Sequence, residues 1–288
     1  MIKAEAVFKN YNKAIRRAYE KALSNINDDE GENDFRQAKE YLEECVRNEL
    51  AKWENTSVDE ISGITPLEYF NGINDFDELI DLFKAGAVIC DDDLPQALLN
   101  KLKSFGDEAV ERLMQLAFDN EGHNLEGNNS LIALNAIKVL GIWKSDNAVG
   151  KMIDMLFTLS EHDDELFKES IRESLVNIGF PSVDPIMGQL EAAQSLNDAH
   201  EYLMMALADI GAKNKSDKIY RCLKNTFLKM SNKVLGAACL AAYGDGRAIP
   251  ALRGYIEKNR NTIDSVTFFE IKGAIEKLGG NADDLIFI

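Results

Sequence analysis

Imidazole groups bind metal ions and transfer protons near neutral pH, so the three histidines of this 288-residue sequence are its first candidates for chemistry. His123, His162 and His200 are each separated by nearly 40 residues, and no HExxH or other close metal-ligand spacing joins them. This spacing favours three separate structural or solvent-exposed roles. We therefore predict no shared metal centre and no histidine-based catalytic site.

Two acidic segments contain the oxygen ligands that divalent cations use. The loop DNEGHNLEGNNS at 119–130 would match an EF-hand only with Gly at 124 and Glu at 130, and it has Asn124 and Ser130 instead. The run EHDDE at 161–165 is typical of an exposed connection whose charge favours the start of the next helix. We predict no resident metal and no cofactor, with a divalent ion at 161–165 as the alternative.

Cysteine and glycine motifs of known enzymes are missing from the sequence. No CxxC pair, GxxxxGK[ST], GxGxxG or GxSxG motif occurs, which removes the usual support for redox, nucleotide-dependent and hydrolase chemistry. The cysteines are expected to be small buried apolar residues in a reducing compartment. They are Cys45, Cys90, Cys222 and Cys239. We predict no catalytic residue.

Charge is distributed unevenly along the chain. The net charge of −17 argues against a general nucleic-acid binder, yet residues 211–260 hold eleven basic and three acidic side chains, a net +8 against −25 for the rest. The basic side chains are expected on exposed faces of adjacent helices. There they form a solvated surface, a docking surface for an acidic protein segment or, as a third alternative, a nucleic-acid contact. The predicted partner-binding residues are Lys218, Arg221, Lys224, Lys229, Arg247, Arg253 and Lys258.

Composition predicts an all-α, soluble, cytoplasmic protein. Apolar residues make up 45% of the chain and only five prolines occur, so disorder is not expected. The N-terminal stretch carries Glu5 and Glu20 and lacks an unbroken apolar segment, so we expect no signal peptide there. The apolar run from Leu235 to Tyr243 is far shorter than the roughly 20 residues that span a bilayer.

A repeat sets the expected architecture, because glycines follow apolar helical runs at intervals of 32 to 38 residues. Each glycine is predicted to end one helix, and a Ser or Asp after it to cap the next. The marker glycines are Gly106, Gly141, Gly179, Gly211, Gly244 and Gly279. The predicted caps are Asp107, Ser145, Ser182, Ser216 and Asp245. Second helices are expected at 217–229 and 247–258, with the bases facing outward.

Two segments, LAAYGDGRAIPALRGYI and SLVNIGFPSVDPIMGQL, show this unit most clearly. They resemble the short HEAT-like repeat of phycobilisome lyases and many bacterial repeat proteins. The resemblance covers about residues 91–288 and implies a right-handed α-solenoid of HEAT-like helix pairs. The family pattern opens a unit with an acidic residue followed by Val-Arg. DDELFKESI approaches this with Phe167 and Lys168, whereas NKVLGAACL departs from it with Leu235 at the basic position.

The first 90 residues do not show the period. Helices are predicted at 3–26, 34–54 and 76–89, with Thr65, Pro66 and Glu68 starting another through a capping box. Asp93 with Gln96 predicts the cap that opens the array. The expected domains are 1–90, as a degenerate pair of units or a separate helical cap, and 91–288, as about five and a half to six units.

The expected function is a non-catalytic protein–protein interaction scaffold or adaptor that uses the solenoid surface, because stacked repeats present extended surfaces. The alternative is an enzyme of HEAT-like fold, similar to bilin lyases or to repeat-type DNA glycosylases. The pattern places neither Trp53 nor Trp143 in a base-stacking groove, which favours the scaffold. A regulatory subunit or toxin-neutralising partner is a third possibility, supported by fold analogy alone.

Overall fold

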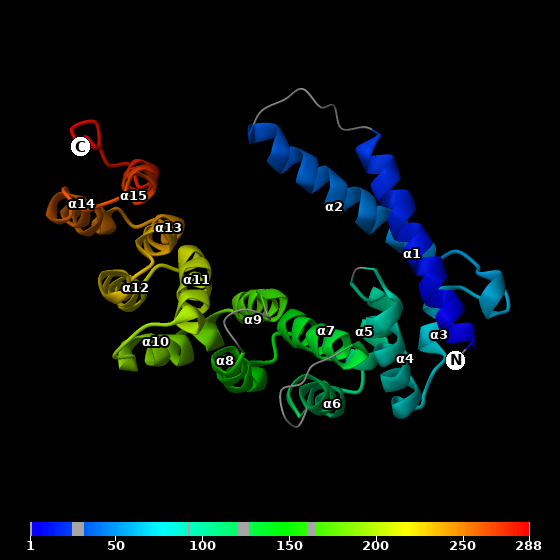
Figure 1. Cartoon of the computed structure of the whole chain (residues 1–288). Coiled ribbons are helices and arrows are strands. Elements are labelled where there is room, and N and C mark those ends of the chain that lie inside the picture. Colours follow the sequence, from blue (N-terminus) through cyan, green and yellow to red (C-terminus); the bar gives the residue numbers. More distant parts are fainter. Residues whose placement is uncertain (1, 25–31, 92, 120–126, 160–164, 288) are drawn as a thin grey trace. The chain divides into compact units, whose positions relative to one another are not determined.

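The protein is all-α, as the composition predicts. A computed structural model describes residues 2–24, 32–91, 93–119, 127–159 and 165–287, with the backbone alone at 2–4 and 32–37. Every regular element within these ranges is a helix (Figure 1). Among the same helices, none combines the length and apolar composition that crossing a bilayer requires.

The chain forms two compact units, Met1–Ala136 and Ile137–Ile288, which divide inside helix α7. The predicted boundary between 90 and 91 lies within unit 1, so the assignment of 1–90 and 91–288 as separate domains stays a prediction. The helices of unit 1 are α1 Ile2–Leu23, α2 Glu32–Glu54, η1 Asp59–Ile61, α3 Pro66–Asn71, α4 Phe76–Ile89, α5 Gln96–Lys103, α6 Asp107–Phe118 and the first part of α7 Asn128–Ile142.

Helix α1 packs along α2 and against α4 within unit 1 (Figure 1). Its predicted apolar face is buried throughout, since the spacing of three and four residues places those side chains on one side of the helix. These residues are Val7, Tyr11, Ala14, Ala18 and Ala22. The buried Asn12 amide also ties α1 to the end of α4, donating to the Ile89 carbonyl at 2.8 Å and accepting from the Asp91 N–H at 3.2 Å.

Two predicted helix starts in unit 1 have different outcomes. Thr65 caps α3 in a capping box with Glu68, and Pro66 is the first helical residue, as predicted. The predicted cap at Asp93 is wrong, because the residue before α5 is Pro95, which offers no side-chain hydrogen bond. A carboxylate from α2 takes that role: Glu54 Oε1 accepts the Ala97 N–H at 2.8 Å. Such a cap comes from tertiary packing and has no local sequence signal.

Unit 2 is built from two rows of helices (Figure 1). In one row, α9, α11, α13 and α15 contact each other in turn, and in the other α8 contacts α10 and α10 contacts α12. Helix α14 continues the second row, since the Phe227 and Tyr255 rings pair across α12 and α14. The bounds are η2 Asp146–Ala148, α8 Val149–Thr158, α9 Glu165–Ile178, η3 Phe180–Ser182, α10 Val183–Ala192, α11 Asp198–Lys213, α12 Asp217–Lys229, α13 Lys233–Tyr243, η4 Gly246–Ala248, α14 Ile249–Lys258 and α15 Ser265–Lys277.

Four of the six marker glycines occupy turns with positive φ, as predicted, and two do not. Gly106, Gly179, Gly244 and Gly279 have φ between 61° and 84°. Gly141 and Gly211 lie inside α7 and α11, so the prediction that they end helices is wrong. A Cβ on Gly141 would lie 2.6 Å from Ser174 Cα, and one on Gly211 would lie 2.8 Å from Ile219 Cγ2. These two glycines permit close helix packing.

The predicted caps of the array are confirmed in part. Ser216 and Asp245 accept backbone N–H groups at the starts of α12 and η4. Ser145 and Ser182 stand at cap positions but make no capping side-chain bond, and Ser182 Oγ donates to the Leu175 carbonyl at 3.0 Å instead. Asp107 is the first residue of α6, where Gly106 is the cap, so that prediction is wrong.

Ion pairs join α9 to α11 in the first row of unit 2. Lys168 Nζ lies 2.6 Å from Asp198 Oδ2, and the Lys168 side chain is only 2% exposed. One turn further along α9, Arg172 Nη1 lies 2.6 Å from Asp209 Oδ2. At the next step Asn232 Nδ2 donates to Glu201 Oε2 at 3.0 Å, without a basic residue. Among the described residues of this row, the ion pairs between neighbouring helices are those that join α9 to α11.

Replacing Asp198 with Ala should lower the free energy of unfolding by about 3 kcal/mol, because it leaves the buried Lys168 ammonium unpaired. This value lies at the lower end for buried pairs, since the Asp198 carboxylate is itself one-third exposed. Urea denaturation measures the change. The double variant Lys168→Met/Asp198→Ala should recover most of the loss, and equal stability of the single and double variants would contradict this account.

Replacing Gly141 with Ala should lower the free energy of unfolding by about 1–3 kcal/mol, because the new Cβ collides with the Ser174 backbone. Gly188 provides the control, since it is an exposed glycine inside α10 with nothing within 4 Å of its added Cβ. Gly188→Ala should raise stability by about 0.5–1 kcal/mol. Thermal denaturation separates the two, and a neutral Gly141→Ala would argue against close packing of α7 on α9.

Candidate functional site

Unit 2 has a basic groove of about 640 Å³ between α12 and α14, called here the α12–α14 groove. Every charged side chain among the described residues that line it is basic. The lining residues are Tyr220, Lys224, Leu228, Lys233, Arg247, Pro250, Ala251, Gly254, Tyr255, Lys258 and Asn259. In a chain of net charge −17, this concentration of cations marks the groove as a candidate site for an acidic ligand.

Helical spacing explains how these residues come together. On α12 the lining side chains recur every four residues, at 220, 224 and 228, which places them on one face. The two helices run in the same direction: Tyr220 Oη donates to the Arg247 carbonyl at 2.6 Å, and the Phe227 and Tyr255 ring centroids lie 6.0 Å apart. The groove therefore extends along the length of both helices.

Arg247 closes one end of the groove and is already paired. Its guanidinium lies 2.7 Å from an oxygen of Asp217 and 2.7 Å from one of Asp245, and its Cζ is 4.4 Å from the Tyr220 ring centroid. Hydrogen bonds from Arg247 lower the pKa of both carboxyl groups. Two carboxylates thus balance this cation, which suits it to fixing the geometry of the groove mouth.

Lys233 reaches the groove from the start of α13. Its Nζ donates to the Phe227 carbonyl at 2.6 Å and the Leu228 carbonyl at 3.1 Å, where α12 ends. It also lies 5.0 Å and 5.3 Å from the ring centroids of Phe227 and Tyr255. Burial lowers its pKa, and no carboxylate pairs with it among the described residues. Helix carbonyls and aromatic faces hold this half-buried charge in place.

Lys224 and Lys258 differ from Lys233, because they form no hydrogen bond to any described residue, whereas Lys233 donates to two carbonyls. Lys224 is half-buried, Lys258 is exposed, and neither forms an ion pair within the part of the chain that the structure describes. The wall that α12 faces across the groove is formed by small residues of α14, namely Pro250, Ala251 and Gly254. An acidic group entering here meets two ammonium groups with no competing carboxylate in the lining.

Three of the seven predicted partner-binding residues, Lys224, Arg247 and Lys258, line this groove. Lys218 and Arg221 are exposed on α12 outside the lining and form no ion pair with any described residue. The structure therefore does not bring the seven residues together at one place. Their role in partner binding stays a prediction.

The remaining two predicted residues face other surroundings. Lys229 lines a separate hollow of about 400 Å³, where Glu191 from α10 contributes the opposite charge. Arg253 is half-buried, pairs with Asp284, and donates to the Asn281 carbonyl at 2.6 Å. Asp284 lies outside the segment whose charges were counted, so sequence counting overestimates the free positive charge at Arg253.

Sequence reasoning missed the role of Lys233 and the two tyrosines of the groove. Lys233 is one of the eleven basic residues of 211–260 but is not one of the seven predicted partner-binding residues, although a Lys just after a helix end is a signal for carbonyl contacts. The helical spacing that predicts outward-facing bases places Tyr220 and Tyr255 on the opposite, inward side of their helices. Tyr220 is buried and Tyr255 half-buried, yet both also line the groove.

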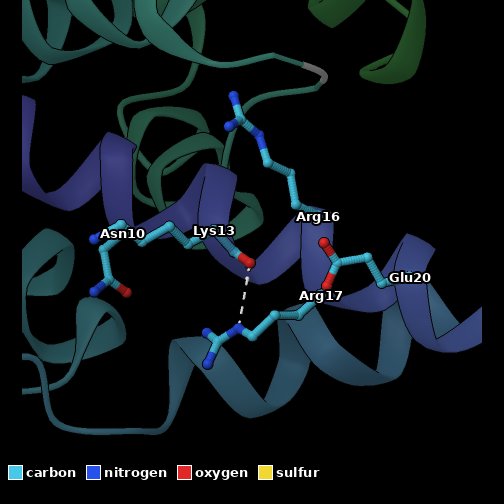
Figure 2. A pocket seen from close by; sticks show the side chains of 5 residues that line it. All are labelled: Asn10, Lys13, Arg16, Arg17 and Glu20. Atoms are coloured by element: carbon cyan, nitrogen blue, oxygen red, sulfur yellow. Dashed lines mark hydrogen bonds between the residues drawn. The ribbon is translucent and has the colours of Figure 1, made fainter.

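A second basic hollow, of about 390 Å³, lies on α1 in unit 1 (Figure 2). Its described lining comes from one helix, and Arg16 and Arg17 leave that helix in different directions (Figure 2). Arg17 Nε donates to the Lys13 carbonyl at 3.2 Å, and Arg16 pairs with Asp91 at 2.6 Å. Glu20 also lines this hollow. The mixed charge makes it a weaker candidate for an acidic ligand than the α12–α14 groove.

The residues considered for metal or acid–base chemistry do not form a site in the described ranges. His123, His162 and most of the two acidic segments lie outside those ranges. Burial lowers the pKa of His200, whose Nδ1 accepts the Asn197 N–H at 3.1 Å. Among the described residues, no three His, Cys, Asp or Glu side chains are grouped as metal ligands.

The cysteines are less uniformly buried than predicted. Cys222 and Cys239 are buried, and burial raises the pKa of their thiols to about 11 and about 12. Cys45 and Cys90 are half-buried. Thiols with raised pKa values are protonated at neutral pH and are poor nucleophiles. This agrees with packing roles for the two buried cysteines.

Replacing Asp245 with Asn should lower the free energy of unfolding at pH 7 by about 0.5–1 kcal/mol, because Asn keeps the cap but loses the charge that faces Arg247. The folded pKa of Asp245 is lowered from 3.8, so its stabilisation is present above that value and is lost as the pH falls through the folded pKa. The difference between wild type and variant, measured by urea denaturation, should shrink at acid pH. Asp184→Asn is the control, because Asp184 is an exposed acidic residue in the first turn of α10. If the stability difference for Asp245→Asn does not change with pH, the ion pair of Asp245 with Arg247 is not its cause.

Comparison with known proteins supplies no family for this chain. No protein-family model, no curated protein and no solved structure matches it. The resemblance of its segments to HEAT-like repeats therefore stays a prediction. The function has to be argued from the groove itself.

Proposed function

We propose that this protein is a non-catalytic protein–protein interaction scaffold whose α12–α14 groove binds an acidic segment of a partner protein. One observation carries the proposal: four cations line the groove, and no acidic side chain is among its described lining residues. Three of the four, Lys224, Lys233 and Lys258, have no carboxylate partner among the described residues.

The architecture supports the scaffold part of this proposal. The two rows of unit 2, together with the positive-φ glycines that precede η3 and η4, are the features expected of HEAT-like helix pairs in a right-handed solenoid. Stacked pairs expose a row of parallel second helices, and grooves between such helices accept extended or helical segments. We propose this solenoid arrangement for the array.

Electrostatics favour a protein ligand over a nucleic acid. The strongly negative chain repels a polyanion at long range, and the groove offers few cations compared with the phosphate contacts that nucleic-acid affinity needs. An acidic peptide needs only two or three carboxylates at the groove, and its apolar side chains can contact Leu228, Pro250 and the tyrosines. Charge complementarity of this kind sets specificity and association rate.

Selection of random short peptides displayed on phage tests the proposal directly. On the wild-type chain, enriched sequences should be rich in Asp and Glu, although a protein of net charge −17 would otherwise repel them. The double variant Lys224→Glu/Lys258→Glu should lose this enrichment, because it reverses the two groove cations that have neither an ion-pair nor a hydrogen-bond partner among the described residues. Affinity of the enriched peptides should also fall with added salt.

The matched control is Lys218→Glu/Arg221→Glu, which makes the same change of charge on α12 outside the groove lining. This control should keep the acidic enrichment nearly unchanged. Enrichment without acidic residues, or equal loss in both double variants, would reject binding in the groove. Circular dichroism and thermal denaturation confirm that each variant is folded.

A further inference from the structure

Four glycines inside described helices are exposed and would place an added Cβ within 4 Å of no other atom: Gly150, Gly188, Gly254 and Gly273. Gly254 belongs to α14. It is exposed in the helix interior, has an ordinary helical φ, and a Cβ placed on it would meet no atom within 4 Å. Glycine is one of the least favourable residues at such a position, and neither a turn nor close internal packing requires it here. Of these four glycines, Gly254 is the one that lines the α12–α14 groove.

The residues next to Gly254 in the groove divide into charged and apolar contacts. Lys258 follows one turn later on the same face of α14, and Lys224 belongs to the face of α12 that lines the groove. Leu228 is 56% exposed and lies one turn after Lys224. The groove thus presents two ammonium groups beside an apolar surface and a stretch of backbone without a side chain.

We propose that the main chain of the acidic partner segment crosses α14 directly over Gly254. Its carboxylates then reach Lys224 and Lys258, and an apolar residue between them rests on Leu228 and Ala251. This inference rests on the proposed function and specifies its ligand: a segment with an aliphatic or aromatic residue between acidic residues. A side chain at 254 would hold the segment away from both lysines.

Fluorescence anisotropy tests the inference by measuring the affinity of the chain for one peptide. The peptide is the acidic sequence most enriched on the wild-type chain, labelled with fluorescein. Gly254→Leu should weaken its binding at least about tenfold, because the new side chain occupies the space that the main chain needs. Gly254→Ala should weaken binding less, while raising the thermal denaturation midpoint through better helix propensity. A variant that is more stable yet binds more weakly cannot be explained by unfolding.

Gly188→Leu is the matched control, since Gly188 is the sixth residue of α10 as Gly254 is of α14, is also exposed, and does not line the groove. It should bind the peptide with wild-type affinity. In addition, replacing the peptide's central apolar residue with Ser should weaken binding to the wild-type chain.

The possible results separate the two proposals. Suppose that Gly254→Leu binds the peptide as tightly as wild type while Lys224→Glu/Lys258→Glu does not. The proposed path of the main chain over Gly254 is then wrong, and the proposal that the groove binds an acidic segment is retained. If neither change affects binding, the groove is not the site and both proposals fail. If a single-stranded oligonucleotide displaces the peptide and binds more tightly, the ligand class is wrong and both also fail.

Discussion

Short helices with one apolar face can bury that face only against other helices, and the structure of unit 2 depends on this constraint. Helix α11 shows it most clearly, because α9, α10, α12 and α13 all contact it. Its buried residues consequently surround much of the helix. They are Ala199, His200, Tyr202, Leu203, Met204, Ala206, Leu207, Ala208, Ile210 and Gly211. Helix α12, in the row with α8 and α10, instead buries one face and exposes Lys218, Arg221 and Leu228.

The groove is a consequence of residue size on this exposed side. Where α14 faces α12, its side chains are those of Pro250, Ala251 and Gly254, which are too small to fill the space between the helices. The larger contacts, Tyr220 with Arg247 and Phe227 with Tyr255, hold the helices together at two places along their length. The ammonium group of Lys233 lies over the Phe227 and Tyr255 rings and brings a half-buried charge to the same region. The same packing that joins α12 to α14 therefore leaves a basic groove between them.

Local patterns in the sequence predicted a large part of this fold. Helix α12 was expected at 217–229 and α4 at 76–89, and both have those bounds, because amphipathic spacing and caps such as Ser216 are local signals. Gly141 and Gly211 were misassigned, since a glycine that permits close packing and one that ends a helix look alike in sequence. The cap that Glu54 supplies to α5 was likewise hidden, because the two residues are 43 positions apart.

The candidate site was predictable only in its charge. The excess of basic residues in 211–260 points to α12 and α14. It does not distinguish the available cations Lys224 and Lys258 from Arg253, whose partner Asp284 lies outside that segment. Nor could it show that Lys229 faces a different hollow beside Glu191. These distinctions depend on which helix lies next to which, and therefore on tertiary packing. They also determine which cations remain available to a ligand.

Chemical-shift mapping of the isotope-labelled full chain, titrated with the selected acidic peptide, tests the central claim most directly. The account predicts that the largest backbone changes cluster at Lys224, Leu228, Gly254 and Lys258. Little change is expected at Lys218, at Arg221 or in the hollow on α1. Changes centred on α1, or spread evenly over exposed lysines, would contradict the assignment of the α12–α14 groove as the docking site.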